Sequence, residues 1–105
     1  MIHVLATIEV RPGTREPFLR EFLQIVPDVR AEDGCLAYGA AVDEPAGLPA
    51  QPDARPDVVV VVEQWRDLPA LRAHLAAPHM TAYRARVKDL VIRTTLQVLR
   101  PVDGG

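Results

Sequence analysis

Five consecutive valines at positions 58–62 constrain the fold of this 105-residue chain more than any other feature. Valine favours strands, and a strand with one buried and one wet face should alternate apolar and polar residues. The strand predicted over Val58–Trp65 instead begins apolar on both faces. The chain's own helices can cover one face, so the other face needs a different cover, and a second copy of the chain is the simplest one. The alternative is a monomer that leaves surplus valines at its surface.

Two helical regions are predicted from apolar residues at 3–4 spacing. The first is capped by Thr14, and Pro27 should kink or split it, because proline cannot donate to the carbonyl group four residues earlier. The second is capped by Asp67 and interrupted by Pro78. The side chains expected on the buried sides are Phe18, Phe22, Ile25, Val26 and Val29 in the first region, Leu68, Leu71 and Leu75 before Pro78, and Met80, Tyr83, Val87 and Val91 after it.

Three further strands are predicted over residues 2–10, 35–42 and 94–102. The connection 43–57 contains four prolines and is expected to be a surface loop, long for a hairpin. The order is strand, helix, strand, strand, helix, strand. It indicates an α+β fold of the ferredoxin-like type, with a four-stranded antiparallel sheet and helices on one face. Two such sheets packed face to face would form a dimeric α+β barrel.

Length and composition exclude several classes of protein. The chain fits one domain, predicted over residues 1–102 with a tail at 103–105, and its 49% apolar residues can form a core. Twelve basic and fourteen acidic residues are intermixed and aromatics make up 5%, so the basic stripe and stacking rings of a nucleic-acid-binding protein are lacking. Cys35 is the only cysteine, which leaves no intrachain disulfide. No apolar run fits a membrane helix or a secretion signal, so we expect a cytoplasmic protein with no membrane contact.

Three blocks of the sequence resemble the antibiotic biosynthesis monooxygenase family. They are ATIEVRPG at 6–13, VRAEDGCLAY at 29–38, and EQWRD at 63–67 followed by LRAHL at 71–75 and PHM at 78–80. The resemblance implies a dimeric α+β barrel that oxidises quinol-like or polycyclic phenols with oxygen and without a cofactor. An electron-rich phenol, once deprotonated, can give an electron to oxygen itself. The protein then has to bind the ring, help to remove a proton and stabilise the anion.

The resemblance carries over to some functional positions and not to others. The pocket tryptophan and arginine of the polyketide-oxidising members correspond to Trp65 and Arg84, whereas their asparagine and tyrosine are replaced by Val61 and Leu71. This departure leaves open a dimer that binds a small hydrophobic ligand without converting it. An isomerase on the same scaffold, which needs a base but no oxygen, is a third interpretation. Haem degradation is disfavoured, because the asparagine, tryptophan and histidine of that branch correspond to Ala6, His74 and Arg84.

Trp65 and Arg84 are predicted to contact the ligand. The Trp65 ring would stack on a planar substrate, and the alternative is plain packing in the core. Arg84 is expected on the buried side of its helix, where an unpaired charge is costly. It would stabilise a phenolate or a quinone oxygen there, or else pair with Glu63 or Glu9.

His74 is the candidate catalytic base, because histidine exchanges a proton near neutral pH. The alternative is a boundary histidine that makes one hydrogen bond. Tyr83 and His79 are the remaining predicted ligand contacts, although Tyr83 could be core and His79 could face solvent. The three histidines do not have the spacing of a metal site, and no glycine-rich phosphate loop is present. We therefore expect neither a metal nor an organic cofactor.

Overall fold

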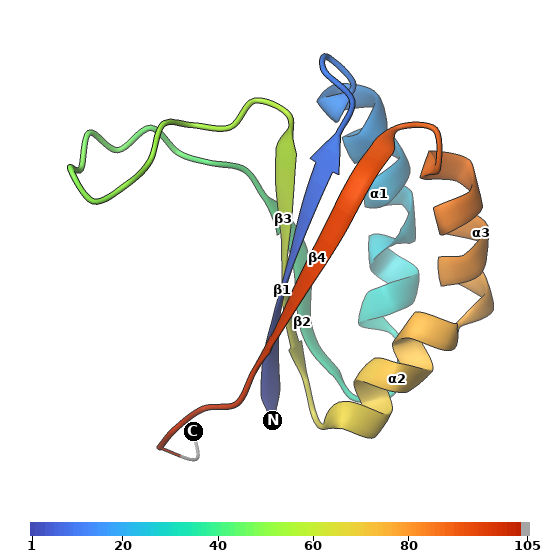
Figure 1. The fold of residues 1–105 in the computed structure, drawn as a ribbon. Helices are drawn as coiled ribbons and strands as arrows, with labels where there is room; N and C mark the ends of the chain where they lie inside the picture. The colour runs from blue at the N-terminus through green and yellow to red at the C-terminus, as the bar shows by residue number, and fades with distance from the viewer. Residues whose placement is uncertain (104–105) are drawn as a thin grey trace.

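The structure, a computed structural model, describes residues 1–103. Its elements are β1 (Ile2–Val10), α1 (Arg15–Arg30), β2 (Cys35–Ala41), β3 (Val58–Trp65), α2 (Leu68–Ala76), α3 (Pro78–Val87) and β4 (Val91–Leu99). The helices lie on one face of a four-stranded antiparallel sheet (Figure 1). The predicted α+β fold with ferredoxin-like order is therefore confirmed. Of the predicted tail, Gly104 and Gly105 lie outside the described residues.

The sheet has the strand order β2-β3-β1-β4, so β1 and β3 are central and β2 and β4 are the edges. Ala6 of β1 pairs with Val61 of β3 on one side and with Leu96 of β4 on the other. Residues paired in this way point to the same face of a sheet. The register therefore puts Leu96 on the face that carries the helices.

The two faces of the sheet differ in their cover. Val59 and Val61 point toward the helices and are 0% and 2% exposed. Val62, on the opposite face, is 46% exposed, and Leu99 of β4, on the same face by its register with β1, is 43% exposed. The chain's own helices thus cover one face and leave apolar side chains on the other. In Figure 1 the connection between β2 and β3 projects on the side of the sheet away from the helices.

Helix α1 packs through the five side chains predicted for its buried side, which are Phe18, Phe22, Ile25, Val26 and Val29. Pro27 was predicted to kink or split this helix, and the prediction of a split is wrong. The helix continues to Arg30, since one missing donor near its C-terminal end leaves the flanking turns intact. Thr14 occupies the N-cap position but makes no cap bond, because its hydroxyl donates to the Arg11 carbonyl at 2.7 Å.

The second helical region begins as predicted and packs differently. The Asp67 carboxylate caps α2 by accepting from the Ala70 amide at 2.9 Å, and Pro78 separates α2 from α3. The predicted burial of Leu68 and Leu75 is wrong, because the buried stripe of this nine-residue helix runs through Ala70, Leu71 and His74. Leu68 and Leu75 flank that stripe and are 44% and 39% exposed.

Two strand boundaries also differ from the prediction. β2 ends at Ala41 rather than Val42, and β4 spans Val91–Leu99 rather than 94–102. Val91 pairs with Val10 at the end of β1, so the chain enters the sheet three residues early instead of extending α3. No helix of residues 1–103 has both the length and the apolar character needed to cross a membrane.

Candidate functional site

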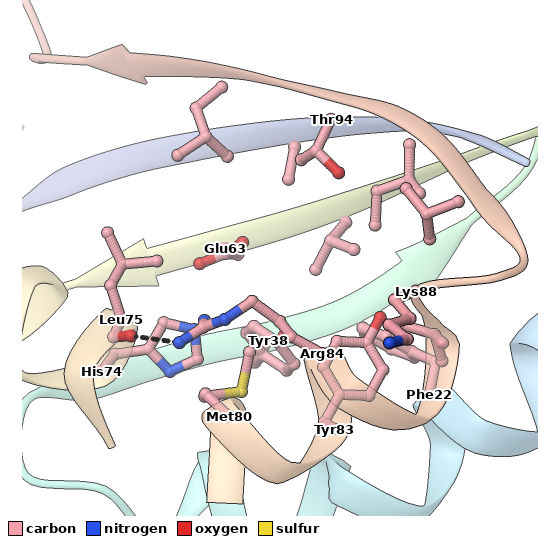
Figure 2. Close-up of a pocket in the computed structure, with 16 residues that line it drawn as sticks. Phe22, Tyr38, Glu63, His74, Leu75, Met80, Tyr83, Arg84, Lys88 and Thr94 are labelled. Carbon is pink, nitrogen blue, oxygen red and sulfur yellow. Dashed lines mark hydrogen bonds between the residues drawn. The ribbon is translucent and has the colours of Figure 1, made fainter. Parts of the chain in front are cut away.

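A cavity of about 360 Å³ lies between the sheet and the helices α2 and α3 (Figure 2). Its volume falls within the range of small-ligand pockets. Most of its lining is apolar and comes from every strand and helix of the fold. Leu96 of β4 lines it while remaining 45% exposed, and the exposed side chains of Arg84 and Lys88 line it from the end of α3. The cavity therefore opens to solvent between β4 and α3.

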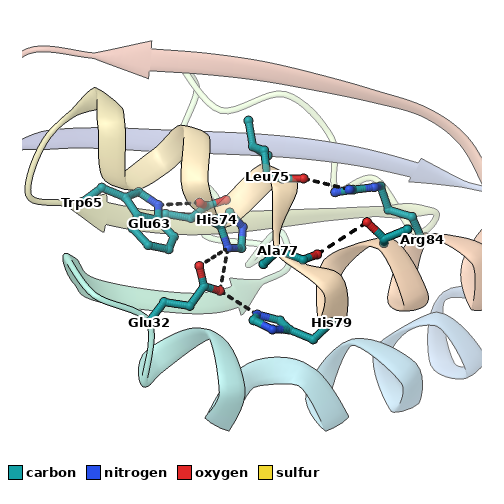
Figure 3. Close-up of polar contacts among 9 residues, drawn as sticks. Glu32, Glu63, Trp65, His74, Leu75, Ala77, His79 and Arg84 are labelled. Atoms are coloured by element: carbon teal, nitrogen blue, oxygen red, sulfur yellow. Dashed lines mark hydrogen bonds and ion pairs between the residues drawn. The ribbon is translucent and has the colours of Figure 1, made fainter.

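His74 is held at the inner end of the cavity by a carboxylate. Its Nδ1 atom lies 2.9 Å from one oxygen of Glu32 and 3.2 Å from the other (Figure 3). The ring lies between the Trp65 ring, 4.6 Å away between centroids, and the Tyr38 ring, 5.5 Å away. The side chain is 2% exposed, so rotation of the imidazole is restricted by packing and by the hydrogen bond together.

This arrangement fixes which imidazole nitrogen faces the cavity. Glu32 can only accept, so the neutral His74 ring donates from Nδ1 and carries its lone pair on Nε2. His74 makes no other hydrogen bond within the described part of the chain, where no fully buried side-chain nitrogen or oxygen lacks a partner. Nε2 therefore reaches the cavity that His74 lines. Burial lowers the pKa of His74, and the Glu32 carboxylate opposes that shift only in part.

Glu63 is the second buried titratable group that lines the cavity. It lies on β3 with the phase of Val59 and Val61, faces the helices, and is 5% exposed. Trp65 Nε1 donates to one of its carboxylate oxygens at 2.8 Å. Burial raises the pKa of Glu63 to about 7; the Trp65 hydrogen bond lowers it, and the nearby Glu32 charge raises it further.

Arg84 reaches across the cavity from α3, as Figure 2 shows. Its Nη2 atom donates to the Leu75 carbonyl at 2.8 Å, which anchors the guanidinium beside His74. The expectation that Arg84 lies buried is wrong, and so is the alternative that it pairs with Glu63 or Glu9. The residue is exposed because it sits at the open side of the cavity, and Glu63 and Glu9 bond to Trp65 and Arg93 instead.

The structure brings three of the five predicted site residues together and places two behind them. His74, Tyr83 and Arg84 line one cavity, whereas Trp65 and His79 do not. Trp65 is 0% exposed and lies against the far side of the His74 ring. His79 Nε2 lies 2.8 Å from Glu32, so both histidines share one carboxylate (Figure 3). In the single chain Trp65 and His79 thus orient the groups that line the cavity.

Sequence reasoning missed the roles of two acidic residues. Glu63 carried a usable signal, because it continues the alternation of Val59 and Val61 on the face that the helices cover. Glu32 carried none, since it precedes β2 and meets His74 across 42 positions of sequence. Among residues 1–103, no group of three or more histidine, cysteine or acidic side chains is arranged to hold a metal ion.

Comparisons with known proteins agree with this fold. The model of the family described as antibiotic biosynthesis monooxygenase matches residues 1–86. The chain is 43% identical over 103 residues to the Escherichia coli (strain K12) protein named "Probable quinol monooxygenase YgiN", covering 96% of this chain and 98% of that protein.

Solved structures show the same fold. The crystal structure of PA3566 from Pseudomonas aeruginosa superposes with a TM-score of 0.80 at 28% identity, covering 96% of this chain and 93% of that one. Rv0793 from Mycobacterium tuberculosis superposes with a TM-score of 0.78 at 30% identity, covering 97% and 95%. These three relatives align over nearly their whole length, so the similarity extends to all the elements that line the cavity.

Proposed function

Because this chain belongs to the antibiotic biosynthesis monooxygenase family, we propose that it oxidises a quinol or a polycyclic phenol with molecular oxygen in the cavity beside His74. One observation carries the proposal beyond family membership: a buried, neutral histidine presents Nε2 to an apolar cavity while a carboxylate holds its other nitrogen. This is the arrangement of a general base, since the carboxylate fixes the tautomer and stabilises the imidazolium that forms.

The cavity residues divide the chemistry between them. His74 Nε2 removes the proton of a substrate hydroxyl group, and the phenolate that results can give an electron to oxygen without a cofactor. Arg84 stabilises the developing anion from the open side, where its guanidinium is already anchored on Leu75. Tyr83 contacts the substrate ring from α3. Trp65 and His79 act indirectly, through the His74 ring and through Glu32.

We also propose that two copies of the chain associate through the face of the sheet that lacks helices. That face carries Val62 and Leu99, both more than 40% exposed, although such side chains favour burial. Pairing two of these faces would close the dimeric α+β barrel that the sequence predicts. The cavity lies on the opposite face of the sheet, so association would leave its opening free of the second sheet.

A second candidate function is binding without turnover. Val61 lines the cavity and Leu71 is buried in the core, so two positions that the family resemblance assigns to polar side chains supply no hydrogen bonds here. A ligand would then be held mainly by apolar contact, and the protein would bind it without converting it. An isomerase on the same scaffold would use His74 alone and would need no oxygen.

Oxygen uptake with a panel of naphthalene diols and polycyclic phenols tests the proposal. We expect the wild-type protein to consume oxygen, His74→Ala to lower kcat by about 10²–10⁴-fold, and Arg84→Ala to lower it by about tenfold. Arg86→Ala is the matched control, since Arg86 lies on the same helix but pairs with Glu21 outside the cavity. Saturable binding without product would select the binding function, and turnover under anaerobic conditions would select the isomerase. Equal oxygen uptake by all four proteins would refute the assigned roles.

A further inference from the structure

We propose that Glu63 is a second catalytic group of the cavity, a carboxylic acid that donates the proton needed when the oxygen–oxygen bond of the substrate's hydroperoxide breaks. The inference deepens the proposed monooxygenase function and rests on it. It gives a chemical role to a buried side chain that has none in the proposed function, where His74 is the base and Arg84 stabilises the anion.

The position of the Glu63 carboxyl group carries the argument. One oxygen is fixed by Trp65 Nε1 at 2.8 Å, and the other makes no hydrogen bond to any described residue. Since no fully buried side-chain oxygen of residues 1–103 lacks a partner, that second oxygen is open to the cavity that Glu63 lines. Figure 2 shows the carboxyl group on the sheet side of the cavity, facing the Arg84 and His74 side chains across it.

The charges around Glu63 favour its protonated form. No lysine, arginine or histidine of the described chain forms an ion pair with it, although it is 5% exposed. An ionised carboxylate in such a place is costly, so a proton is retained to higher pH than on a surface glutamate. The titratable and charged groups that line the cavity with Glu63 or interact with it are Glu32, Cys35, Tyr38, His74, Tyr83, Arg84 and Lys88, of which the two cations, Arg84 and Lys88, belong to exposed residues at the end of α3.

Glu63 and His74 therefore hold complementary protonation states near neutral pH. Burial raises the pKa of Glu63 to about 7, so about half of the molecules carry the acid at that pH. Burial lowers the pKa of His74, so its ring is mostly neutral under the same conditions. Two groups whose pKa values are shifted in opposite directions provide one proton donor and one proton acceptor in the same cavity.

The reaction balances with these two groups. His74 takes the hydroxyl proton, the phenolate reduces oxygen by one electron, and the two radicals combine to form a carbon–oxygen bond. The imidazolium returns its proton to the peroxide, which gives a hydroperoxide on a ring carbon that still bears hydrogen. His74 then removes that hydrogen as a proton, a C=O bond forms, and the O–O bond breaks toward the distal oxygen. Glu63 protonates this oxygen, which leaves as water, and the imidazolium restores the proton of Glu63; the sum is phenol plus O₂ giving quinone plus water.

The single tryptophan offers a test that does not depend on turnover. Trp65 donates to Glu63, so its fluorescence should change as Glu63 ionises, with a midpoint near pH 7. Glu63→Gln keeps an oxygen acceptor for Trp65 but cannot ionise, so this transition should vanish. Because the His74 ring also contacts Trp65, the titration is repeated in a His74→Gln background, which removes the signal from the histidine. A wild-type signal that stays flat between about pH 5.5 and 8.5 would overturn the inference.

Turnover then separates this inference from the function on which it rests. In the wild type, kcat should fall above about pH 7 as the acid loses its proton. Glu63→Gln should lower kcat by about 10²-fold, leave KM within about threefold, and abolish that alkaline limb. If the wild type converts a phenol to its quinone and Glu63→Gln keeps both the rate and the pH profile, Glu63 is only an acceptor for Trp65 and the monooxygenase function stands. If the wild type consumes no oxygen with any substrate, the function itself fails.

Discussion

The two faces of the sheet are built from similar residues and have different consequences for the protein. Along β3, Val59 and Val61 are buried on the side of the helices, whereas Val62 on the other face is nearly half-exposed. Burial at about 25 cal/mol per Å² makes the first pair part of the folding free energy of the chain. The same apolar area on the second face contributes only when another molecule covers it.

The charged groups of the two faces differ in the same way. On the open face, Glu9 accepts from Arg93 Nε at 2.7 Å, and the pair is largely hydrated and weakly coupled to stability. On the covered side, Glu63 and His74 are both buried. Burial raises the pKa of Glu63, which has no ion-pair partner among the described residues, and lowers the pKa of His74. Helices that cover only part of this face leave both buried side chains and an open cavity on it.

A matched pair of substitutions on β3 tests this difference most strongly. Val59→Asp puts an unpaired charge at a position with 0% exposure and should lower the free energy of unfolding by at least about 3–5 kcal/mol, most of what a domain of this size has. Val62→Asp, three residues along the same strand, should leave the single chain folded but prevent two open faces from meeting. Urea unfolding measures the first effect, and sedimentation measures the second as a loss of dimer.

Two outcomes would contradict the comparison. If Val62→Asp destabilises the chain as much as Val59→Asp without changing its mass in solution, the second face is buried by something within the chain. If Val62→Asp sediments as a dimer with undiminished affinity, the copies do not meet through this face of the sheet.

Sequence reasoning succeeded where the signal is local. The bounds of β1 and β3, the Asp67 cap and the break at Pro78 follow from alternation and from residues that act within a turn. The boundary of β4 failed because pairing with β1, a contact between distant segments, decided that Val91 enters the sheet. The capping role of Thr14 failed because its hydroxyl found a different local partner.

The sequence predicted which types of residue form the candidate site, but not which residues contact one another there. His74 was identified from the chemistry of histidine, but the carboxylate that orients it lies 42 positions away, and no spacing rule links them. Arg84 was assigned to the buried side because it follows Met80 by one turn, yet the cavity opens at that side and leaves the residue exposed. Which side of α3 is exposed to solvent depends on how β4 packs beside it, and this is set by tertiary structure.

The pH dependence of stability sharpens the contrast between the faces through Glu63. Its pKa is raised from 4.5 to about 7 by burial, so between these values the folded chain holds a proton that the unfolded chain has lost. The stability this group contributes is complete below about pH 4.5 and is lost as the pH rises through 7, by about 3 kcal/mol in total. The free energy of unfolding of Glu63→Gln minus that of wild type should therefore increase by this amount from about pH 4.5 to 8. The opposing contribution of His74 is present in both proteins and cancels in this difference; an unchanged difference would show that Glu63 is hydrated.

The smallest effect compares two aspartates that make the same bond on opposite sides of the molecule. Asp67 accepts from the Ala70 amide at 2.9 Å and begins a helix that covers the sheet, whereas Asp43 accepts from the Arg55 amide at 2.9 Å in the connection that projects away from the helices (Figure 1). Asp67→Ala should lower the free energy of unfolding by about 1 kcal/mol, because α2 loses its cap. Asp43→Ala should leave the urea midpoint unchanged, since its ion pair with Arg55 only closes an exposed loop. A loss of stability in Asp43→Ala that appears only at protein concentrations where the dimer forms would instead place this loop against the second copy and extend the open face beyond the sheet.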